Sequence, residues 1–251
     1  MKKQVCYYFQ HHAGLEFIHS RNSDISYPLH NHVSTYVIGF LLKGNITLIR
    51  ENEKTRCAPK TLFIIPPYEP HAIDADTPYD LLTICLHKNA LASTHPAELK
   101  QLAARYLSEI LPANALNKAD HHTLENVIDA VFHRHSHFLR KTESRTISRL
   151  RARLETHAEN RISIKEMAQA AFTSQYHFIR QFRKNAGLTP YRFQIQNRIR
   201  KAQKMLPLTR TLTELAYLTG FYDQSHFIRH FKKVLGMTPG EYLDAVHTLP
   251  E

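Results

Sequence analysis

The sequence predicts a two-domain fold, with an N-terminal all-β barrel and following helices ahead of a C-terminal all-α domain. Short apolar runs rich in β-branched residues occupy about residues 5–87. Helical periodicity then replaces them, and the C-terminal part contains one helical segment twice. The expected units are residues 1–90 for the barrel, 91–144 for a helical dimerisation or linker region, and 145–251 for the all-α domain.

Four short strands are expected in the barrel. Each is a brief apolar run, and turn residues such as Lys43-Gly44-Asn45 and Pro66-Pro67 separate one run from the next. Several short strands at this spacing are typical of an all-β barrel or sandwich. The expected strands cover residues 36–42, 46–49, 62–65 and 81–86.

Two amphipathic helices follow the barrel. One apolar stripe runs from Leu99 to Ile110 and ends at Pro112, and a second runs from Leu124 to Phe132. Each stripe must be buried, either against the barrel of the same chain or against a second copy. Packing within the chain is the simpler arrangement, and a two-fold homodimer is the alternative. Residues 113–120 are expected to form a loop, and residues 140–145 a linker.

Composition limits the class of protein. The 251 residues are 43% hydrophobic and 22% charged, as in a globular protein, and no run of about 18 apolar residues predicts a membrane helix. The N-terminal residues lack the apolar core of a signal peptide. The cysteines, Cys6, Cys57 and Cys85, are odd in number and form no CxxC pair, which favours a reducing cytoplasm over a disulfide framework.

The positive charge is concentrated at one end of the chain. Residues 145–251 contain 18 Lys and Arg against 8 Asp and Glu, whereas residues 1–144 contain 15 against 14. A basic domain beside a nearly neutral one favours a polyanionic partner for the basic part alone. A charged surface that serves only solubility is the other explanation.

The strongest signal is an internal repeat. Residues Gln175–Pro190 align with Gln224–Pro239 at an offset of 49 residues, and ten of the sixteen positions are identical. Two copies are too few for a solenoid. Each copy is preceded by a short helix pattern, at residues 164–171 and 212–219, so the sequence predicts two helix-turn-helix units.

Local residue chemistry supports each unit. Gly220 suits the left-handed position in a turn, and Ser174 and Asp223 are suitable N-caps for the second helices. Phenylalanines four residues apart are expected on the buried faces, and glycines are expected to end these helices: Phe178, Phe182, Phe227, Phe231, Gly187 and Gly236. A long helix over residues 191–206, stopped by Pro207, is expected to hold the two units at a fixed separation. A plain helical bundle with a duplicated hairpin is the alternative.

The segment Gly220–Pro239 closely resembles the signature of the AraC/XylS family of bacterial transcription regulators, and the resemblance covers about residues 145–247. It implies a sequence-specific regulator that binds double-stranded promoter DNA, with both units entering the major groove on one side of the duplex. The residues that it places against base edges are Tyr176, Ile179 and Arg180 in the first unit and Ser225, His226 and Arg229 in the second. Those expected to hold phosphates are Arg183, Lys184, Lys232 and Lys233.

Ile179 departs from the family pattern, because its counterpart is often polar. Contact with RNA polymerase, a homodimer and a cytoplasmic location are further expectations of this interpretation, and no membrane partner is expected. Whether the protein activates or represses is left open.

The N-terminal part resembles the cupin-type effector domain of this family. The residues that carry the resemblance are Pro28-Leu-His-Asn-His32, Gly44 and Pro66-Pro-Tyr-Glu-Pro-His71. His30 and His32 are two apart and share a face on a strand, and the cupin pattern adds His71 inside the barrel. Tyr36 stands where cupin enzymes usually place a carboxylate.

Three interpretations of this group stay open. A small polar effector is expected to bind through His30, His32, Tyr36 and His71. Alternatively, His30, His32 and His71 bind a transition metal that is the signal, with no cofactor certain. The third interpretation is that the histidines only stabilise the barrel. A further candidate pair of metal ligands is His133 and His137, four residues apart.

An enzyme is not expected. The sequence contains no GxSxG, Walker, GxGxxG or HExxH motif. Only the cupin-type histidines are suited to chemistry, as in a cupin metalloenzyme, and such an enzyme would not normally carry a basic domain of this kind. A metalloenzyme is therefore the remote alternative.

Overall fold

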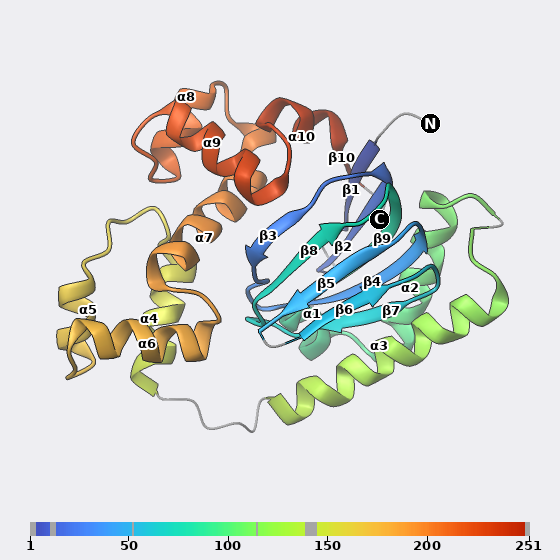
Figure 1. Ribbon diagram of the computed structural model, residues 1–251, viewed down its shortest axis with the longest axis horizontal. Helices are drawn as coiled ribbons and strands as arrows, with labels where there is room; N and C mark the ends of the chain where they lie inside the picture. The colour runs from blue at the N-terminus through green and yellow to red at the C-terminus, as the bar shows by residue number, and fades with distance from the viewer. Residues whose placement is uncertain (1–3, 11–13, 52, 114, 139–144, 249–251) are drawn as a thin grey trace.

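The computed structural model describes residues 4–10, 14–51, 53–113, 115–138 and 145–248. The strands of its first half and one short C-terminal strand, β10 (Val246–Thr248), form two β-sheets (Figure 1). The six-stranded sheet has the order β10-β1-β2-β9-β4-β7, and the four-stranded sheet has the order β3-β8-β5-β6. The strands of the barrel are β1 (Gln4–Gln10), β2 (Leu15–Ser23), β3 (Tyr27–His30), β4 (Thr35–Lys43), β5 (Ile46–Arg50), β6 (Glu53–Cys57), β7 (Leu62–Ile65), β8 (His71–Ala75) and β9 (Tyr79–His87).

The two faces of the larger sheet have different partners. On β4, the alternate residues Val37 and Leu41 belong to a core cluster shared with Leu48 and Ile73 of the smaller sheet. Tyr36 and Ile38 point to the opposite face, which the helices after the barrel cover. This alternation is the ordinary consequence of strand geometry.

Three helices pack against the outer face of the larger sheet: α1 (Lys88–Ser93), α2 (Pro96–Ile110) and α3 (Lys118–Phe138). The expected stripe residues Leu99 and Tyr106 of α2 and Leu124 and Ile128 of α3 are buried in this cluster. The chain therefore buries both stripes on its own barrel, as in the simpler of the two expected arrangements. Homodimerisation stays a prediction.

The second half is helical. Its elements are α4 (Arg145–Thr156), α5 (Ile164–Ala170), α6 (Gln175–Ala186), α7 (Pro190–Met205), the 3₁₀ turn η1 (Leu206–Leu208), α8 (Leu212–Leu218), α9 (Gln224–Leu235) and α10 (Pro239–Ala245), followed by β10 (Val246–Thr248). The pairs α5–α6 and α8–α9 are the two expected helix-turn-helix units, and α7 runs between them (Figure 1).

The expected start and stop signals are present. Ser174 and Asp223 accept hydrogen bonds from the backbone of the second helix of each unit, at His177 N and His226 N. Gly187 and Gly236 end these helices with φ of 75°. Both halves of the expected fold class are confirmed: a β-rich domain followed by a helical domain with two helix-turn-helix units.

The second unit shares its hydrophobic core with the barrel. Phe227 and Phe231 of α9 lie in one cluster with Val5 and Tyr7 of β1. The rings of Tyr7 and Tyr242 are 4.9 Å apart between centroids, and β10 pairs in parallel with β1. The first unit has a second core, in which α4 packs on Phe178 and Phe182 and to which the barrel contributes Tyr68. In the described residues, no helix is long and apolar enough to cross a membrane.

Candidate functional site

Most of the residues expected to contact DNA are exposed on the two second helices. On α6, Tyr176 is 78% exposed, and Arg180 follows one turn later. On α9, Ser225 and Arg229 occupy the equivalent positions and are exposed. The four expected phosphate contacts lie further along the same helices and are exposed as well: Arg183, Lys184, Lys232 and Lys233. Each unit thus presents a polar and basic helix face to solvent.

Two of the residues expected to contact bases are less exposed to solvent. Ile179 is partly buried and packs against the core of the first unit. Burial of its apolar surface stabilises the fold, so Ile179 contributes to the core as well as to the exposed helix face. His226 is also partly buried, and its ring packs against those of Phe221 and His230. Both residues therefore lie at the edge of the exposed face.

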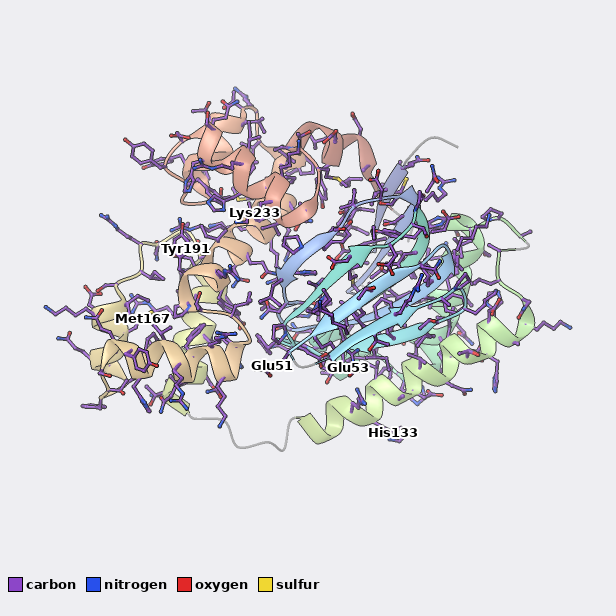
Figure 2. All side chains as sticks on the ribbon, viewed as in Figure 1. Glu51, Glu53, His133, Met167, Tyr191 and Lys233 are labelled. Carbon is purple, nitrogen blue, oxygen red and sulfur yellow. The ribbon has the colours of Figure 1, made fainter. Side chains whose placement is uncertain are left out.

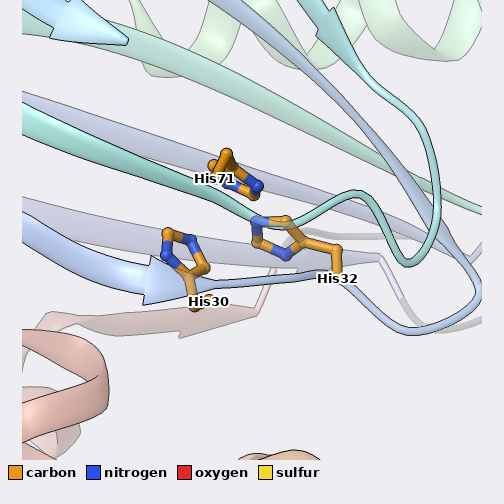
Figure 3. Close-up of side chains that lie close together, drawn as sticks. All are labelled: His30, His32 and His71. Atoms are coloured by element: carbon orange, nitrogen blue, oxygen red, sulfur yellow. The ribbon is translucent and has the colours of Figure 1, made fainter. Parts of the chain in front are cut away.

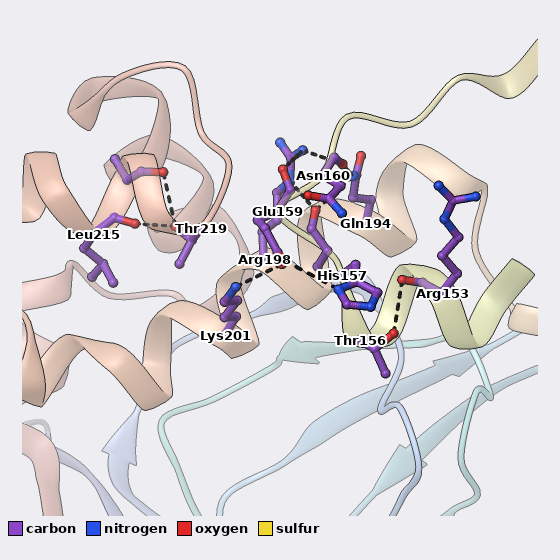
Figure 4. A network of polar contacts seen from close by, with 12 residues as sticks. Arg153, Thr156, His157, Glu159, Asn160, Gln194, Arg198, Lys201, Leu215 and Thr219 are labelled. Carbon is purple, nitrogen blue, oxygen red and sulfur yellow. Dashed lines mark hydrogen bonds and ion pairs between the residues drawn. The ribbon is translucent and has the colours of Figure 1, made fainter.

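Arg198, in the middle of α7, connects the two units. Its guanidinium donates to the carbonyl oxygens of Glu159 and Asn160 (Figure 4) and to that of Ala158, all before the first unit. It also donates to the carbonyl oxygen of Gly220, in the turn of the second unit. These four acceptors come from segments about 60 residues apart in sequence, so one side chain fixes how the units sit relative to each other.

Further contacts strengthen this connection. Lys201 forms an ion pair with Glu159 at 2.9 Å, and Gln194 donates to Ala158 O at 2.9 Å (Figure 4). Gly220 has φ of 83°, and a Cβ on it would lie 2.4 Å from Glu159 O. The turn of the second unit therefore seats directly on the segment before the first unit. The expected fixed separation thus depends on these polar contacts as well as on the length of α7.

At the barrel, the structure brings His30, His32 and His71 together (Figure 3). His30 ends β3, and in the register with β8 it pairs with His71. His32 follows two residues later and, as alternation predicts, faces the same side. One ring nitrogen from each histidine lies within 4.8 Å of the others. The centroid distances are 4.2 Å for His30 to His71 and 5.2 Å from His32 to either.

The surroundings keep these imidazoles neutral. Burial lowers the pKa of His30 to about 4 and of His71 to about 3, and it holds the pKa of His32 well below its usual value. Neighbouring imidazoles and the guanidinium of Arg200, on α7, lower the pKa of His32 and His71 further. Uncharged rings can accept hydrogen bonds or donate lone pairs near pH 7.

Arg200 connects the helical domain to the barrel. It donates to Asn31 O, and the electrostatic neighbours that raise its pKa include Glu16 and Cys85. Glu16 of β2 and Cys85 of β9 are paired across the sheet. Burial lowers the pKa of Arg200 to about 10, so the side chain keeps its charge at neutral pH. A charged guanidinium therefore contacts the segment that carries His30 and His32.

The peptide of Asn31 connects the histidines to α7. Asn31 is fully buried between His30 and His32, and its carbonyl oxygen accepts hydrogen bonds from Gln196 and Arg200. Its side chain donates to Ala186 O, at the end of α6, at 2.6 Å. These contacts were not expected from the sequence, because the residues lie more than 150 positions apart.

Tyr36 does not join the histidines, and this expectation is corrected. Its side chain is buried on the outer face of the larger sheet, against the helices after the barrel. His32 and Tyr36 are four residues apart and would share a face on an unbroken strand. Ser34 between them has φ of 57°, which interrupts the alternation before β4 begins. The structure therefore removes Tyr36 from the candidate effector site.

The second candidate metal pair is only half described. His133 is exposed on α3 (Figure 2), and the side chain of His137 lies outside the described part. The only group of three or more potential metal ligands found among the described residues is His30, His32 and His71.

Both second helices dock on the barrel by their C-terminal glycines. A Cβ on Gly187 would lie 2.1 Å from Tyr68 O, and one on Gly236 would lie 2.4 Å from Cγ2 of Ile25. The sequence singled out these glycines as helix ends only. Their close approach to the barrel leaves the N-terminal, solvent-facing ends of α6 and α9 free.

The fold and these surfaces define a class of two-domain protein, in which a β-barrel is joined to paired helix-turn-helix units. The model of the AraC-like ligand binding domain matches residues 12–166, and that of a helix-turn-helix domain matches residues 167–245. The chain therefore belongs to the AraC family.

One curated relative is the HTH-type transcriptional activator Btr of Bacillus subtilis, 28% identical over 216 residues. The match covers 75% of this chain but only 40% of Btr, so the chain spans less than half of that relative.

Solved structures of ToxT from Vibrio cholerae share the fold. One has a TM-score of 0.59 at 10% identity and covers 97% of each chain. Another, with unsaturated fatty acid bound, has a TM-score of 0.57 at 13% identity and covers 98% of this chain and 97% of that one. At these identities the likeness concerns the fold alone.

Proposed function

We propose that the protein is a sequence-specific DNA-binding transcription regulator whose promoter occupancy is controlled by a ligand bound at the histidine end of the barrel. In this proposal residues 145–251 bind DNA, residues 1–90 bind the ligand, and residues 91–144 connect the two. Regulation, rather than catalysis, is the proposed activity. Homodimerisation and contact with RNA polymerase stay predictions.

The observation that carries the proposal is the matched pair of second helices. Arg180 and Arg229 are exposed at equivalent positions of the two units, and Arg198 fixes the mutual placement of those units. An exposed arginine on a recognition helix pairs well with guanine in the major groove. The trailing Lys and Arg residues are suited to phosphates on either side of the groove.

The contacts between barrel and helical domain support ligand control. A ligand that moves His30 or His32 also moves Asn31, which hydrogen-bonds to α7. ToxT, whose fold this chain shares, has been crystallised with unsaturated fatty acid bound, so a protein of this fold is able to hold a small organic molecule. A coupling free energy of about 1–3 kcal/mol between ligand and DNA is ordinary for such regulation.

Two variants separate the proposed roles on the DNA face. Arg229→Ala is expected to weaken binding by about 1–3 kcal/mol and to relax the preference at one base pair. Lys232→Ala is expected to weaken binding to all sequences similarly and to reduce the salt dependence. The measurement is binding of full-length protein to a selected duplex and to its single-base variants at several salt concentrations. If Arg229→Ala lost affinity equally for every sequence, the assignment of bases to α9 would be wrong.

A further inference from the structure

The three barrel histidines are arranged like ligands rather than like ordinary core residues. The Nδ1 atom of His30 lies 2.8 Å from Pro28 O, and the Nδ1 atom of His71 lies 3.0 Å from Glu69 O. A carbonyl oxygen only accepts hydrogen bonds, so each Nδ1 must carry the proton. In the neutral rings the Nε2 atoms of His30 and His71 therefore keep their lone pairs free.

Such backbone anchoring of one ring nitrogen is the usual support of a metal-bound histidine, because it fixes both the tautomer and the ring orientation. His32 provides the third imidazole from the loop after β3 (Figure 3). The ligand atoms of the three residues lie within 4.8 Å of one another, close enough to converge on one ion with small side-chain adjustments. Imidazole ligands suit Zn²⁺, Co²⁺, Ni²⁺, Cu²⁺ and Fe²⁺.

The charge nearby indicates what completes the site. The guanidinium of Arg200 donates to Asn31 O, the carbonyl between His30 and His32, and its positive charge opposes a bare cation there. Three protein ligands leave a fourth tetrahedral position open on Zn²⁺ or Co²⁺. The guanidinium favours an anionic group in that position, such as hydroxide or the carboxylate of a small molecule.

The same segment contacts the DNA-binding half. Asn31 lies between two of the histidines, and its carbonyl oxygen accepts from Gln196 and Arg200 of α7. Its amide side chain holds the end of α6 through Ala186 O. A shift of residues 30–32 on binding an ion therefore reaches the helix that joins the two helix-turn-helix units.

We propose that His30, His32 and His71 bind one divalent transition metal ion with an anionic fourth ligand, and that Asn31 passes the occupancy of this site to α7. The coupling of this site to DNA binding rests on the proposed regulatory function, whereas the metal site itself does not.

The site is tested first without DNA. Untagged full-length protein, stripped with chelator, is titrated with Co²⁺ while its visible absorption is followed. The expected result is one tight site per chain with the intense spectrum of tetrahedral coordination. Either His30→Gln or His71→Gln is expected to weaken Co²⁺ binding by at least about 100-fold.

His133→Gln is the matched control, since His133 is an exposed histidine outside the site. His30 is only partly buried, so its variant keeps the test usable if His71→Gln fails to fold. Equal Co²⁺ affinity of the wild type and His30→Gln overturns the site. If only His133→Gln lost Co²⁺ binding, the proposed site at His30, His32 and His71 would be wrong and the ion would bind on α3.

The second test concerns coupling. Zn²⁺ is expected to change the affinity of the wild-type protein for its selected duplex by about 5–150-fold. In Gln196→Ala, Co²⁺ affinity is expected to stay unchanged while this Zn²⁺ effect shrinks severalfold. A Zn²⁺ effect on duplex affinity that is as large in Gln196→Ala as in the wild type overturns the role of Asn31.

The two proposals can fail separately. If Co²⁺ does not bind but the protein still prefers one duplex, the metal site is wrong and the proposed function stands. If no duplex is preferred, the proposed function fails while the metal measurement keeps its meaning.

Discussion

Phe172 and Gly220 occupy equivalent places in the two helix-turn-helix units. Each follows the C-cap of the first helix, and the amide nitrogens donate to matching carbonyls, those of Gln169 and Tyr217. Both have a left-handed backbone, with φ of 52° for Phe172 and 83° for Gly220. Only glycine adopts this region without a steric cost, and Phe172 is 98% exposed, so no burial offsets its strain.

Phe172→Gly is therefore expected to raise the free energy of unfolding by about 1 kcal/mol. Gly220→Ala is expected to lower the free energy of unfolding by at least about 1 kcal/mol. The new Cβ would collide with Glu159 O, and alanine is strained at this positive φ. Urea denaturation of both variants measures the difference. An unchanged or lower midpoint for Phe172→Gly would show that this position is not strained.

Glu16 makes the stability of the protein depend on pH near neutrality. Burial raises its pKa to about 7, although Arg200 and Lys204 act in the opposite direction. In the unfolded chain its pKa is near 4.5, so between these values the unfolded state binds fewer protons than the folded state. The contribution of Glu16 to stability is therefore full below pH 4.5, and it is lost as the pH rises through 7.

We expect Glu16→Gln to be more stable than the wild type by about 2 kcal/mol at pH 8 and to differ little from it at pH 4. Denaturant titrations of both proteins at each pH provide the comparison. Tyr7, Cys85 and Tyr242, whose pKa values burial raises, and Arg200, whose pKa is about 10, do not change protonation between pH 4 and pH 8, so the pH dependence of the difference reports Glu16. A difference that does not vary with pH would contradict the raised pKa.

At the scale of elements, α7 is more than a spacer. Arg198 satisfies four backbone carbonyls that belong to both units. Arg198→Met is expected to lower the free energy of unfolding by about 1–3 kcal/mol, since backbone acceptors, most of them partly buried, lose a charged donor. Arg192→Met, on the exposed face of the same helix, is the control and should change stability by less than about 0.5 kcal/mol. Equal effects in chemical denaturation would refute the connecting role of Arg198.

α7 also shows how far sequence patterns reach. Its buried apolar residues, such as Phe193 and Ile199, follow from helical periodicity. Gln194 and Gln196 are buried as well, although their polarity predicts exposure. Their acceptors are carbonyls 36 and 165 residues away, and no local pattern encodes such contacts.

The barrel site shows the same division. Alternation was enough to place His30, at the end of β3, and His32, in the loop that follows, on one face. It failed for Tyr36, because a single left-handed residue, Ser34, intervenes. The sequence pattern also did not predict β3 and β8, the strands that provide His30 and His71. Both strands are short and partly polar. Their identity as strands follows from pairing with distant partners rather than from their own residues.

At the scale of the whole molecule, the barrel and the second unit form one body. Gly236 at the end of α9 lies against Ile25, and Tyr7 packs on Tyr242. The two units are themselves connected through Arg198. A conformational change in the barrel can therefore alter the positions of both second helices.

A double-mutant cycle tests this docking. Gly236→Asn keeps a residue that tolerates the left-handed backbone but adds a Cβ in the space of Ile25, so it is expected to destabilise the protein by about 2 kcal/mol. Ile25→Ala makes room, and the double variant should recover at least half of the loss caused by Gly236→Asn. Stability is measured by urea denaturation. Strict additivity of the two effects would show that the contact does not limit docking.

The proposed function depends most on two second helices that read one duplex in fixed register. Selection of preferred duplexes from a random pool by the wild-type protein should give two half-motifs about 10 base pairs apart. Selection with Arg180→Ala should lose one half-motif, and selection with Arg229→Ala should lose the other. If both variants selected the same motif as the wild type, or if the wild type selected none, paired recognition by α6 and α9 would be contradicted.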